Sequence, residues 1–138
     1  MKYNTIFYHA SRLREVGNTF IVSELNKAGL PDIAPSHGDI LAQLLTCESR
    51  NMSELAQKGH RSKSTVTTLV TKLEKAGFVE RIPDPADSRG VMVRLTARGR
   101  ELGPTFDRIS DGLNHIITSR LSNEEASILQ LLLSKCVD

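Results

Sequence analysis

The chain has 138 residues, of which 39% are hydrophobic and 25% are charged. This length suits one folded domain with a hydrophobic core, and the composition is ordinary for a soluble globular protein. No apolar run is long enough to cross a bilayer, and charged residues soon after the start argue against a signal peptide, so we expect a cytoplasmic protein.

The net charge is only +2, but the positive charges are concentrated in the middle of the chain. Residues 51–100 contain four lysines and six arginines against three glutamates and two aspartates, a balance of +5, which leaves −3 for the remainder. A basic centre is typical of a nucleic-acid-binding surface. On charge alone, a solvated surface is an equally good interpretation.

The two cysteines, Cys47 and Cys136, lie far apart and form no C-x-x-C motif. We therefore expect free thiols. Neither cysteine has a basic sequence neighbourhood, which argues against a reactive thiolate, and a role in sensing oxidants is left open.

Two helices are predicted in the first third of the chain. The first covers residues 4–28 and is ended by Gly29 and Pro31; its apolar stripe is Ile6, Ala10, Leu13, Gly17, Phe20 and Ile21. The second begins near Pro35, with Ala34 or Ser36 as N-cap, and Ser36 to Asp39 has the spacing of a capping box. Its expected core face is Ile40, Leu41, Leu44 and Leu45.

A helix-turn-helix pattern follows. A short helix begins after Asn51, with Glu54 three positions later, and runs to about Lys58. Gly59 and His60 form the turn, and the next helix runs from Ser62 to Gly77. One face of this helix carries Val66, Leu69, Val70 and Leu73, and the opposite face carries Ser64, Thr67, Thr68, Thr71 and Lys72. A face of hydroxyls and a cation suits the major groove of DNA, where threonine methyl groups also match thymine.

A β-hairpin and two more helices complete the pattern. Residues 78–82 and 91–95 are the expected strands, and residues 83–90 are rich in turn formers. Thr96 caps a long helix that runs to about Ser119, and its apolar residues have heptad-like spacing: Leu102, Phe106, Ile109, Leu113 and Ile116. Ser122 to Glu125 is a capping box for a last helix whose apolar side is Ile128, Leu129, Leu132 and Leu133.

The terminal helices carry more apolar surface than the central module needs. This excess favours a homodimer in which the end helices of two chains pack together, and the alternative is a bundle within one chain.

Several local strings together resemble the multiple-antibiotic-resistance regulator (MarR) family over nearly the whole chain. They are Ser53–Ala56, Lys63–Thr67, Leu73–Arg81, Asp84–Arg89, and Leu95-Thr96 with Gly99. The Asp-x-Arg motif followed by Leu-Thr-x-x-Gly is fairly specific. The resemblance implies a mainly α fold with a small β-hairpin wing: a dimeric winged helix-turn-helix regulator with flanking dimerisation helices. We expect one domain, residues 1–138, with a DNA-binding core at about 35–96 and dimerisation helices at about 4–29 and 97–136.

The resemblance also implies roles for individual residues. Arg89 would reach the minor groove, and Asp87 would orient Arg89 and brace the hairpin. A small ligand, for example a phenolic compound, would bind between the dimerisation helices and the DNA-binding module. Gly59-His60-Arg61 departs from the family's usual turn, and His60 could adopt a left-handed conformation there.

The candidate DNA contacts come from the second helix and the wing. The N-terminus of the helix suits phosphate contacts, and its hydroxyl face suits contacts in the groove. For Ser62, a role as N-cap is favoured over a DNA contact. Arg81 and Arg94, on the hairpin strands, are less favoured candidates for phosphate contacts. The candidates are Arg61, Ser62, Lys63, Ser64, Thr65, Thr67, Thr68, Lys72 and Arg89.

These residues predict a sequence-specific regulator that binds double-stranded DNA, with a ligand-responsive repressor on a palindromic operator as the favoured form. The alternative is a winged-helix protein-interaction module without DNA binding. No catalytic motif is present, and neither an enzyme nor a cofactor is expected. A metal site near His37, Asp111 and His115 is conceivable, but ordinary surface histidines are favoured. We expect a nucleoid-associated protein that makes no membrane contact.

Overall fold

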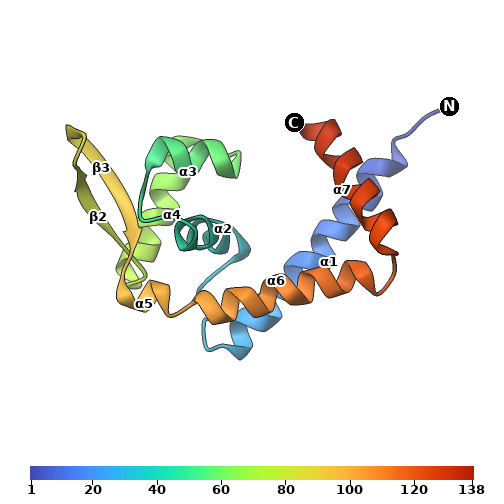
Figure 1. The fold of residues 1–138 in the computed structure, drawn as a ribbon, viewed down its shortest axis with the longest axis horizontal. Helices are drawn as coiled ribbons and strands as arrows, with labels where there is room; N and C mark the ends of the chain where they lie inside the picture. The colour runs from blue at the N-terminus through green and yellow to red at the C-terminus, as the bar shows by residue number, and fades with distance from the viewer. The chain divides into compact units, whose positions relative to one another are not determined.

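The computed structural model describes all 138 residues, which form two compact units, Met1–Phe106 and Asp107–Asp138. The first unit contains α1 (Thr5–Lys27), α2 (Pro35–Leu45), β1 (Arg50–Asn51), α3 (Met52–Gly59), α4 (Lys63–Lys75), β2 (Val79–Asp84), β3 (Asp87–Leu95) and α5 (Ala97–Arg100). Helix α6 (Gly103–Thr118) begins in the first unit and continues into the second, which ends with α7 (Asn123–Val137) (Figure 1). None of these helices combines the length and the apolar character needed to cross a membrane.

The core of the first unit lies between α2, α3, α4 and the inner side of the sheet. The predicted apolar faces of α2 and α4 are largely confirmed: Ile40, Leu41, Leu44, Val66, Val70 and Leu73 are buried, whereas Leu45 and Leu69 are half-buried. Leu55 of α3 and Val79, Val93 and Leu95 of the sheet close the same core. The face of α4 opposite this core is therefore the face that remains for solvent or a partner.

The hairpin is longer than the sequence pattern predicted. Strands β2 and β3 pair from Val79↔Leu95 to Asp84↔Asp87, with an irregularity at Pro83/Asp84, so residues 83–90 are mostly strand. The turn formers act at the tip instead, where Asp84 Oδ1 accepts a hydrogen bond from the Ala86 amide at 2.9 Å. The two strands lie side by side in Figure 1.

The sheet has a third strand that the sequence did not predict. Strand β1 pairs antiparallel with β3, through Arg50↔Val93 and Asn51↔Met92, and the sheet order is β1-β3-β2. Two residues are too short to show the alternation that identifies a strand. Strand β1 leads directly into α3 and so fixes the start of the helix-turn-helix against the wing.

The predicted uninterrupted helix from residue 97 to about 119 is wrong. Helix α5 ends at Arg100 and α6 begins at Gly103. Pro104 has no N–H to donate to the carbonyl of Arg100, and its ring restricts the backbone of Gly103. The heptad-spaced residues beyond this break are largely covered: Ile109 is buried, and Leu113 and Ile116 are half-buried.

Helix α1 has the predicted extent, but half of its apolar stripe is exposed in the single chain: Ile6, Ala10 and Leu13 are exposed, and Gly17, Phe20 and Ile21 are half-buried. Ile6 and Leu13 are 52% and 39% exposed, and only Leu25 of α1 is buried. In the second unit, Ile128 and Leu132 of α7 are likewise 56% and 52% exposed. Exposed apolar side chains along one helix are typical of a protein–protein interface.

Helix α7 begins with the predicted capping box. The Glu125 amide donates to Ser122 Oγ at 3.1 Å, and the Ser122 amide donates to Glu125 Oε1 at 3.0 Å. Two backbone donors at this end of the helix are therefore satisfied by side chains.

Candidate nucleic-acid interface

Helix α3 is fixed at both ends by local hydrogen bonds. At its start, Asn51 Oδ1 accepts from the Glu54 amide at 2.8 Å, while the Asn51 amide donates to Glu54 Oε1 at 3.2 Å. At its end, His60 is left-handed, with φ 53° and ψ 47°, as the sequence suggested. The Arg61 amide then reaches back to the Ala56 carbonyl at 3.0 Å, which closes the turn into α4.

Gly59 lies close to α2. A Cβ on Gly59 would lie 2.9 Å from Asp39 Oδ2, so a larger residue at position 59 would require the Asp39 side chain to move. The left-handed conformation at the end of α3 belongs to His60 and not to this glycine.

The N-terminus of α4 is capped as expected. Ser62 Oγ accepts from the Thr65 amide at 3.1 Å and donates to Thr65 Oγ1 at 2.8 Å, so the N-cap interpretation of Ser62 is confirmed. No group of the chain accepts from the amides of Lys63 and Ser64. These two free donors and the helix dipole make this end of α4 favourable for an anion such as a phosphate.

The outer face of α4 is available to a partner. Lys63, Ser64, Thr65, Thr68 and Lys72 are exposed, and Thr67 is half-buried.

Three threonine hydroxyls of α4 are already used as donors within the helix. Thr67 Oγ1 donates to the Lys63 carbonyl at 2.8 Å, Thr68 Oγ1 to the Ser64 carbonyl at 3.2 Å, and Thr71 Oγ1 to the Thr67 carbonyl at 2.8 Å. Thr71 Oγ1 additionally accepts from Arg81 Nη2 at 2.8 Å. These bonds fix each side-chain rotamer and leave the oxygens of Thr67 and Thr68 as acceptors.

The basic residues near α4 fall into two groups. Arg81 lies 3.6 Å from Glu74, and Arg94 lies 2.7 Å from Glu80, so their charges are partly compensated. Lys63, Lys72 and Arg89 form no ion pair. The charges that are free to bind phosphate are thus those of Lys63, Lys72 and Arg89, which the sequence analysis favoured over Arg81 and Arg94 as DNA contacts.

Asp87 holds the backbone at the tip of the wing. Asp87 Oδ1 accepts from the backbone amide of Arg89 at 2.9 Å, and no ion pair joins the two side chains. The guanidinium of Arg89 is exposed and unpaired, at the end of a hairpin whose backbone is held by Asp84 and Asp87.

The Leu-Thr-x-x-Gly motif joins the base of the wing to the end of α4. Thr96 Oγ1 donates to the Gly77 carbonyl at 2.6 Å and accepts from the Gly99 amide at 3.1 Å. The Thr96 amide donates to the Phe78 carbonyl at 3.0 Å. The wing is therefore oriented relative to α4 by one threonine that satisfies three backbone groups.

Cys47 has a basic neighbour that its sequence context did not reveal. Arg50 Nε donates to Cys47 Sγ at 3.3 Å, and Arg50 Nη1 also donates to Gln43 Oε1 at 3.4 Å. The expectation of a non-basic environment for Cys47 is therefore wrong, because the turn before β1 folds Arg50 back onto it. Both cysteines are free thiols, as expected.

No group of three or more His, Cys, Asp or Glu side chains is arranged to hold a metal ion.

His37 takes the place of the predicted capping box at the start of α2. The N-cap is Ala34, and its amide donates to His37 Nδ1 at 3.2 Å. The Ser36–Asp39 pair does not form a cap. His37 is only 6% exposed, and burial lowers its pKa from the ordinary 6.5, with further lowering by the nearby charges of Lys72 and Arg61.

His37 is expected to make the fold sensitive to acid. The unfolded chain binds a proton at His37 near pH 6.5, whereas the folded chain binds it only at lower pH. Between these two pKa values the unfolded state holds more protons, so the free energy of unfolding falls as the pH falls, by up to about 1.4 kcal/mol per pH unit. We expect His37→Gln, which keeps an acceptor for the Ala34 amide, to flatten the stability profile between pH 7.5 and 5.

Urea unfolding at fixed protein concentration would measure this effect across that pH range. His115→Gln, at an exposed histidine of α6, is the matched control and should retain the wild-type profile. An identical slope in wild type and His37→Gln would assign the acid sensitivity to other groups.

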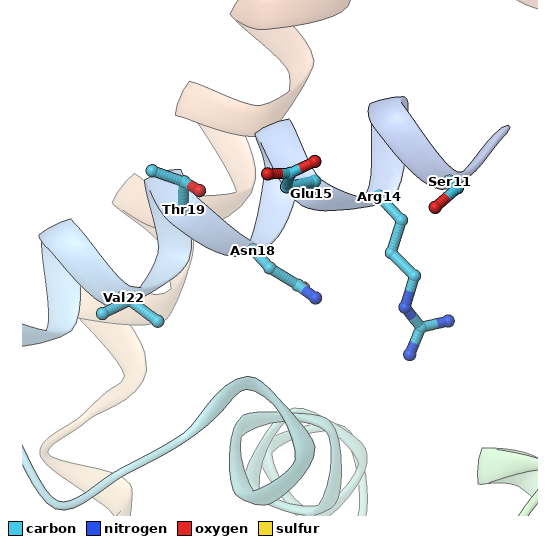
Figure 2. Close-up of a pocket in the computed structure, with 6 residues that line it drawn as sticks. All are labelled: Ser11, Arg14, Glu15, Asn18, Thr19 and Val22. Carbon is cyan, nitrogen blue, oxygen red and sulfur yellow. The ribbon is translucent and has the colours of Figure 1, made fainter. Parts of the chain in front are cut away.

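Two hollows adjoin α1. One, of about 590 Å³, is lined by Ser11, Arg14, Glu15, Asn18, Thr19 and Val22, all from α1 itself (Figure 2). The side chains of Arg14 and Asn18 point from α1 toward α2 (Figure 2). They also line a second hollow of about 690 Å³, which is bounded by the start of α2 and by the turn between α3 and α4. The second hollow therefore lies between α1 and the helix-turn-helix.

Comparisons with known proteins agree with this arrangement. Residues 33–91 match the model of the MarR family. The chain is similar to the transcriptional regulator HosA of Escherichia coli, with 27% identity over 109 residues that cover 79% of this chain and 81% of HosA. It is similar to the multiple antibiotic resistance protein MarR of Escherichia coli, with 34% identity over 71 residues that cover 51% of this chain and 49%, about half, of that relative.

The fold is also similar to that of a solved structure. A mutant MarR from Escherichia coli complexed with operator DNA superposes with a TM-score of 0.85 at 22% identity, covering 96% of this chain and 94% of that chain. The match to the family model includes α2, the helix-turn-helix and most of the wing. The resemblance of this chain to the MarR family is therefore supported by the family model over the winged helix-turn-helix at residues 33–91 and by the similarity to the relatives, and its fold is that of a MarR structure.

Proposed function

We propose that this protein is a transcriptional regulator that binds a specific sequence of double-stranded DNA as a homodimer. The observation that carries this proposal is the exposed face of α4, with its hydroxyl oxygens and the free amides of Lys63 and Ser64, next to a hairpin with an unpaired arginine. Phosphates would contribute most of the affinity, and base edges would provide the specificity. Among the relatives, HosA is a transcriptional regulator by name and MarR is a multiple antibiotic resistance protein by name. A structure of MarR contains operator DNA.

Individual residues have distinct roles in this proposal. Arg61 and Lys63, with the N-terminal end of α4 that Ser62 caps, would contact phosphates, and Arg89 would enter the minor groove, with Asp87 bracing its backbone. Ser64 and Thr65, in the first turn of α4, would join these phosphate contacts, and the groove contacts would come from Thr67, Thr68 and Lys72.

The exposed apolar residues of α1 and α7 support the homodimer. A second copy would cover surface that includes Ile6, Phe7, Leu13, Ile128 and Leu132, which a single chain leaves in water. We assign the DNA-binding core to residues 35–96 and dimerisation to the helices at 4–29 and 97–136. Two recognition helices related by a two-fold axis would contact half-sites about one helical turn apart on a palindromic operator.

The hollow of about 690 Å³ supports a small-molecule effector. It lies between a proposed dimerisation helix, α1, and the turn that positions α4. A ligand there would change DNA affinity only if it binds the DNA-competent and DNA-incompetent forms unequally. We propose a repressor in the cytoplasm, associated with the nucleoid, that releases DNA when a phenolic or similar ligand binds.

Binding to the DNA upstream of the protein's own gene would test the function. Fluorescence anisotropy between 50 and 200 mM salt should show saturable binding that weakens steeply with salt and exceeds binding to a shuffled duplex of equal composition. A winged-helix module that binds only proteins would show no preference for the native duplex. Repeating the titration with candidate phenolic ligands tests the effector separately.

Lys63→Ala is expected to reduce the slope of log K against log salt by about one unit, because one phosphate contact is lost. The reduction should be the same on every DNA sequence, since a phosphate contact carries no base information. Lys27→Ala is the matched control, because Lys27 pairs with Glu24 at the far end of α1. Equal slopes for Lys63→Ala and wild type would remove Lys63 from the phosphate contacts.

A further inference from the structure

The hollow of about 690 Å³ between α1 and the helix-turn-helix has a positively charged lining. Arg14 of α1, Lys58 of α3 and Arg61 of the turn contribute to it, and none of the three forms an ion pair. Asp39 is the only acidic residue in the lining, and its Oδ2 accepts from Gln43 Nε2 at 3.4 Å. Three unpaired cations against one carboxylate make this hollow attractive to an anion.

Two residues that line the hollow have hydrogen-bond donors without an acceptor. Arg61 Nε is buried and has no partner in the chain. The Ser36 amide, in the first turn of α2, donates to no carbonyl or side chain of the chain, and the dipole of α2 adds partial positive charge there. Buried donors are normally bonded, so an unsatisfied donor beside unpaired cations points to an anion from outside the chain.

The exposure of the cations distinguishes between two kinds of anion. Arg14 and Lys58 are exposed, and Arg61 is half-buried. A small phosphate compound would make its ion pairs with Arg14 and Lys58 in water, where each pair contributes little. A DNA strand presents a row of phosphates and gains affinity from every condensed counterion that it releases. Exposed cations in a row therefore suit DNA better than a small anion.

The hollow is also continuous with the proposed DNA surface. Arg61 lines the hollow and directly precedes the N-terminus of α4, where the amides of Lys63 and Ser64 are free. Arg14 reaches the same hollow from the other side, since its side chain points from α1 toward α2 (Figure 2). A strand with one phosphate at the start of α4 can therefore continue across the turn toward α1.

We propose that the sugar–phosphate backbone of the bound DNA enters this hollow, where successive phosphates contact Arg61, Lys58 and Arg14. This inference rests on the proposed function and extends the DNA contacts beyond the winged helix-turn-helix. Helix α1 then has two roles, in dimerisation and in binding the DNA backbone. A ligand that occupies the same hollow would exclude the phosphates, which is a direct way to weaken DNA binding.

The salt dependence of DNA binding by the intact protein tests these contacts. Between 50 and 200 mM salt, Arg14→Gln and Lys58→Gln should each reduce the slope of log K against log salt by about one unit, because each loses one phosphate contact. The reduction should be equal on the native and the shuffled duplex, since phosphates carry no base information. Arg12→Gln is the matched control, because Arg12 lies on the same helix, outside the hollow, and pairs with Glu15 at 2.9 Å.

Two further measurements separate the possible outcomes. Lys58 lies on α3, so its variant keeps the test valid if Arg14→Gln changes dimerisation. If Lys63→Ala reduces the slope while Arg14→Gln and Lys58→Gln keep the wild-type value, the protein binds DNA without this hollow and the inference is overturned. If the wild type does not prefer the native duplex, the proposed function fails first.

Titration with inorganic pyrophosphate, without DNA, tests the hollow for a small anion by backbone amide NMR. We expect weak shifts that do not saturate, because the cations of Arg14 and Lys58 are exposed. Saturable shifts confined to the lining, together with unchanged salt slopes for the two variants, would assign the hollow to a free phosphate compound and overturn the assignment to DNA.

Discussion

Gly99→Ala is expected to lower the free energy of unfolding by about 3 kcal/mol, through overpacking against backbone. A Cβ at position 99 would lie 2.1 Å from the Phe78 carbonyl oxygen and 3.0 Å from Leu95 Cδ2. The carbonyl cannot rotate away, because it accepts from the Thr96 amide at 3.0 Å. Helix α5 would have to separate from the start of β2. At fixed protein concentration, this corresponds to a fall in Tm of about 10 °C.

Gly38→Ala provides the matched control for this substitution. Gly38 lies inside α2, and an added Cβ would meet only Phe106, at 4.0 Å, an ordinary contact. Alanine favours helix more than glycine by up to about 1 kcal/mol, so Gly38→Ala should leave the Tm unchanged or raise it. A Tm for Gly99→Ala within about 2 °C of the wild type would mean that the α5–β2 contact is looser than the structure indicates.

Arg89→Ala is expected to weaken DNA binding roughly tenfold on operators with A·T-rich flanks and about threefold on G·C-rich flanks. The narrow minor groove of A·T-rich DNA has a stronger negative potential, and the wing presents an unpaired guanidinium on a braced backbone. Competition titrations with duplexes that differ only in the flanks would measure the two losses separately.

Arg94→Ala is the control for charge on the wing. Arg94 lies on β3, but its guanidinium pairs with Glu80 at 2.7 Å. Its removal should cause a smaller loss that does not depend on the flanks. If Arg89→Ala lost the same affinity on both flanks, Arg89 would be a phosphate contact, and minor-groove recognition would be ruled out.

The sequence predicted the helix-turn-helix well because each of its boundaries is set locally. Asn51 with Glu54 starts α3, Ser62 starts α4, and a left-handed residue ends α3, all through side chains or backbone within a few residues. The apolar faces of α2 and α4 followed from periodicity alone, because each helix buries one side.

Two errors occurred where pairing between strands decides the structure. Strand β1 exists only because β3 pairs with it, and the length of the hairpin depends on the pairing of β2 with β3. The other errors involve neighbours in the sequence. Arg50 folds back onto Cys47, and the Ala34 amide is bonded by His37 rather than capped through Ser36 and Asp39. The break before α6 follows from Pro104, which is visible in the sequence.

The threonine hydroxyls of α4 impose a condition on any operator. With their protons given to the helix carbonyls, Thr67 and Thr68 offer lone pairs and methyl groups to a base pair. Adenine N6 and cytosine N4 can donate to such oxygens, and thymine has a methyl group to match, but the major-groove edge of guanine offers only acceptors. Recognition of guanine would then depend on Lys63 and Lys72, at the two ends of the exposed face. In the middle of each half-site, replacement of adenine by guanine should weaken binding more than any other base change.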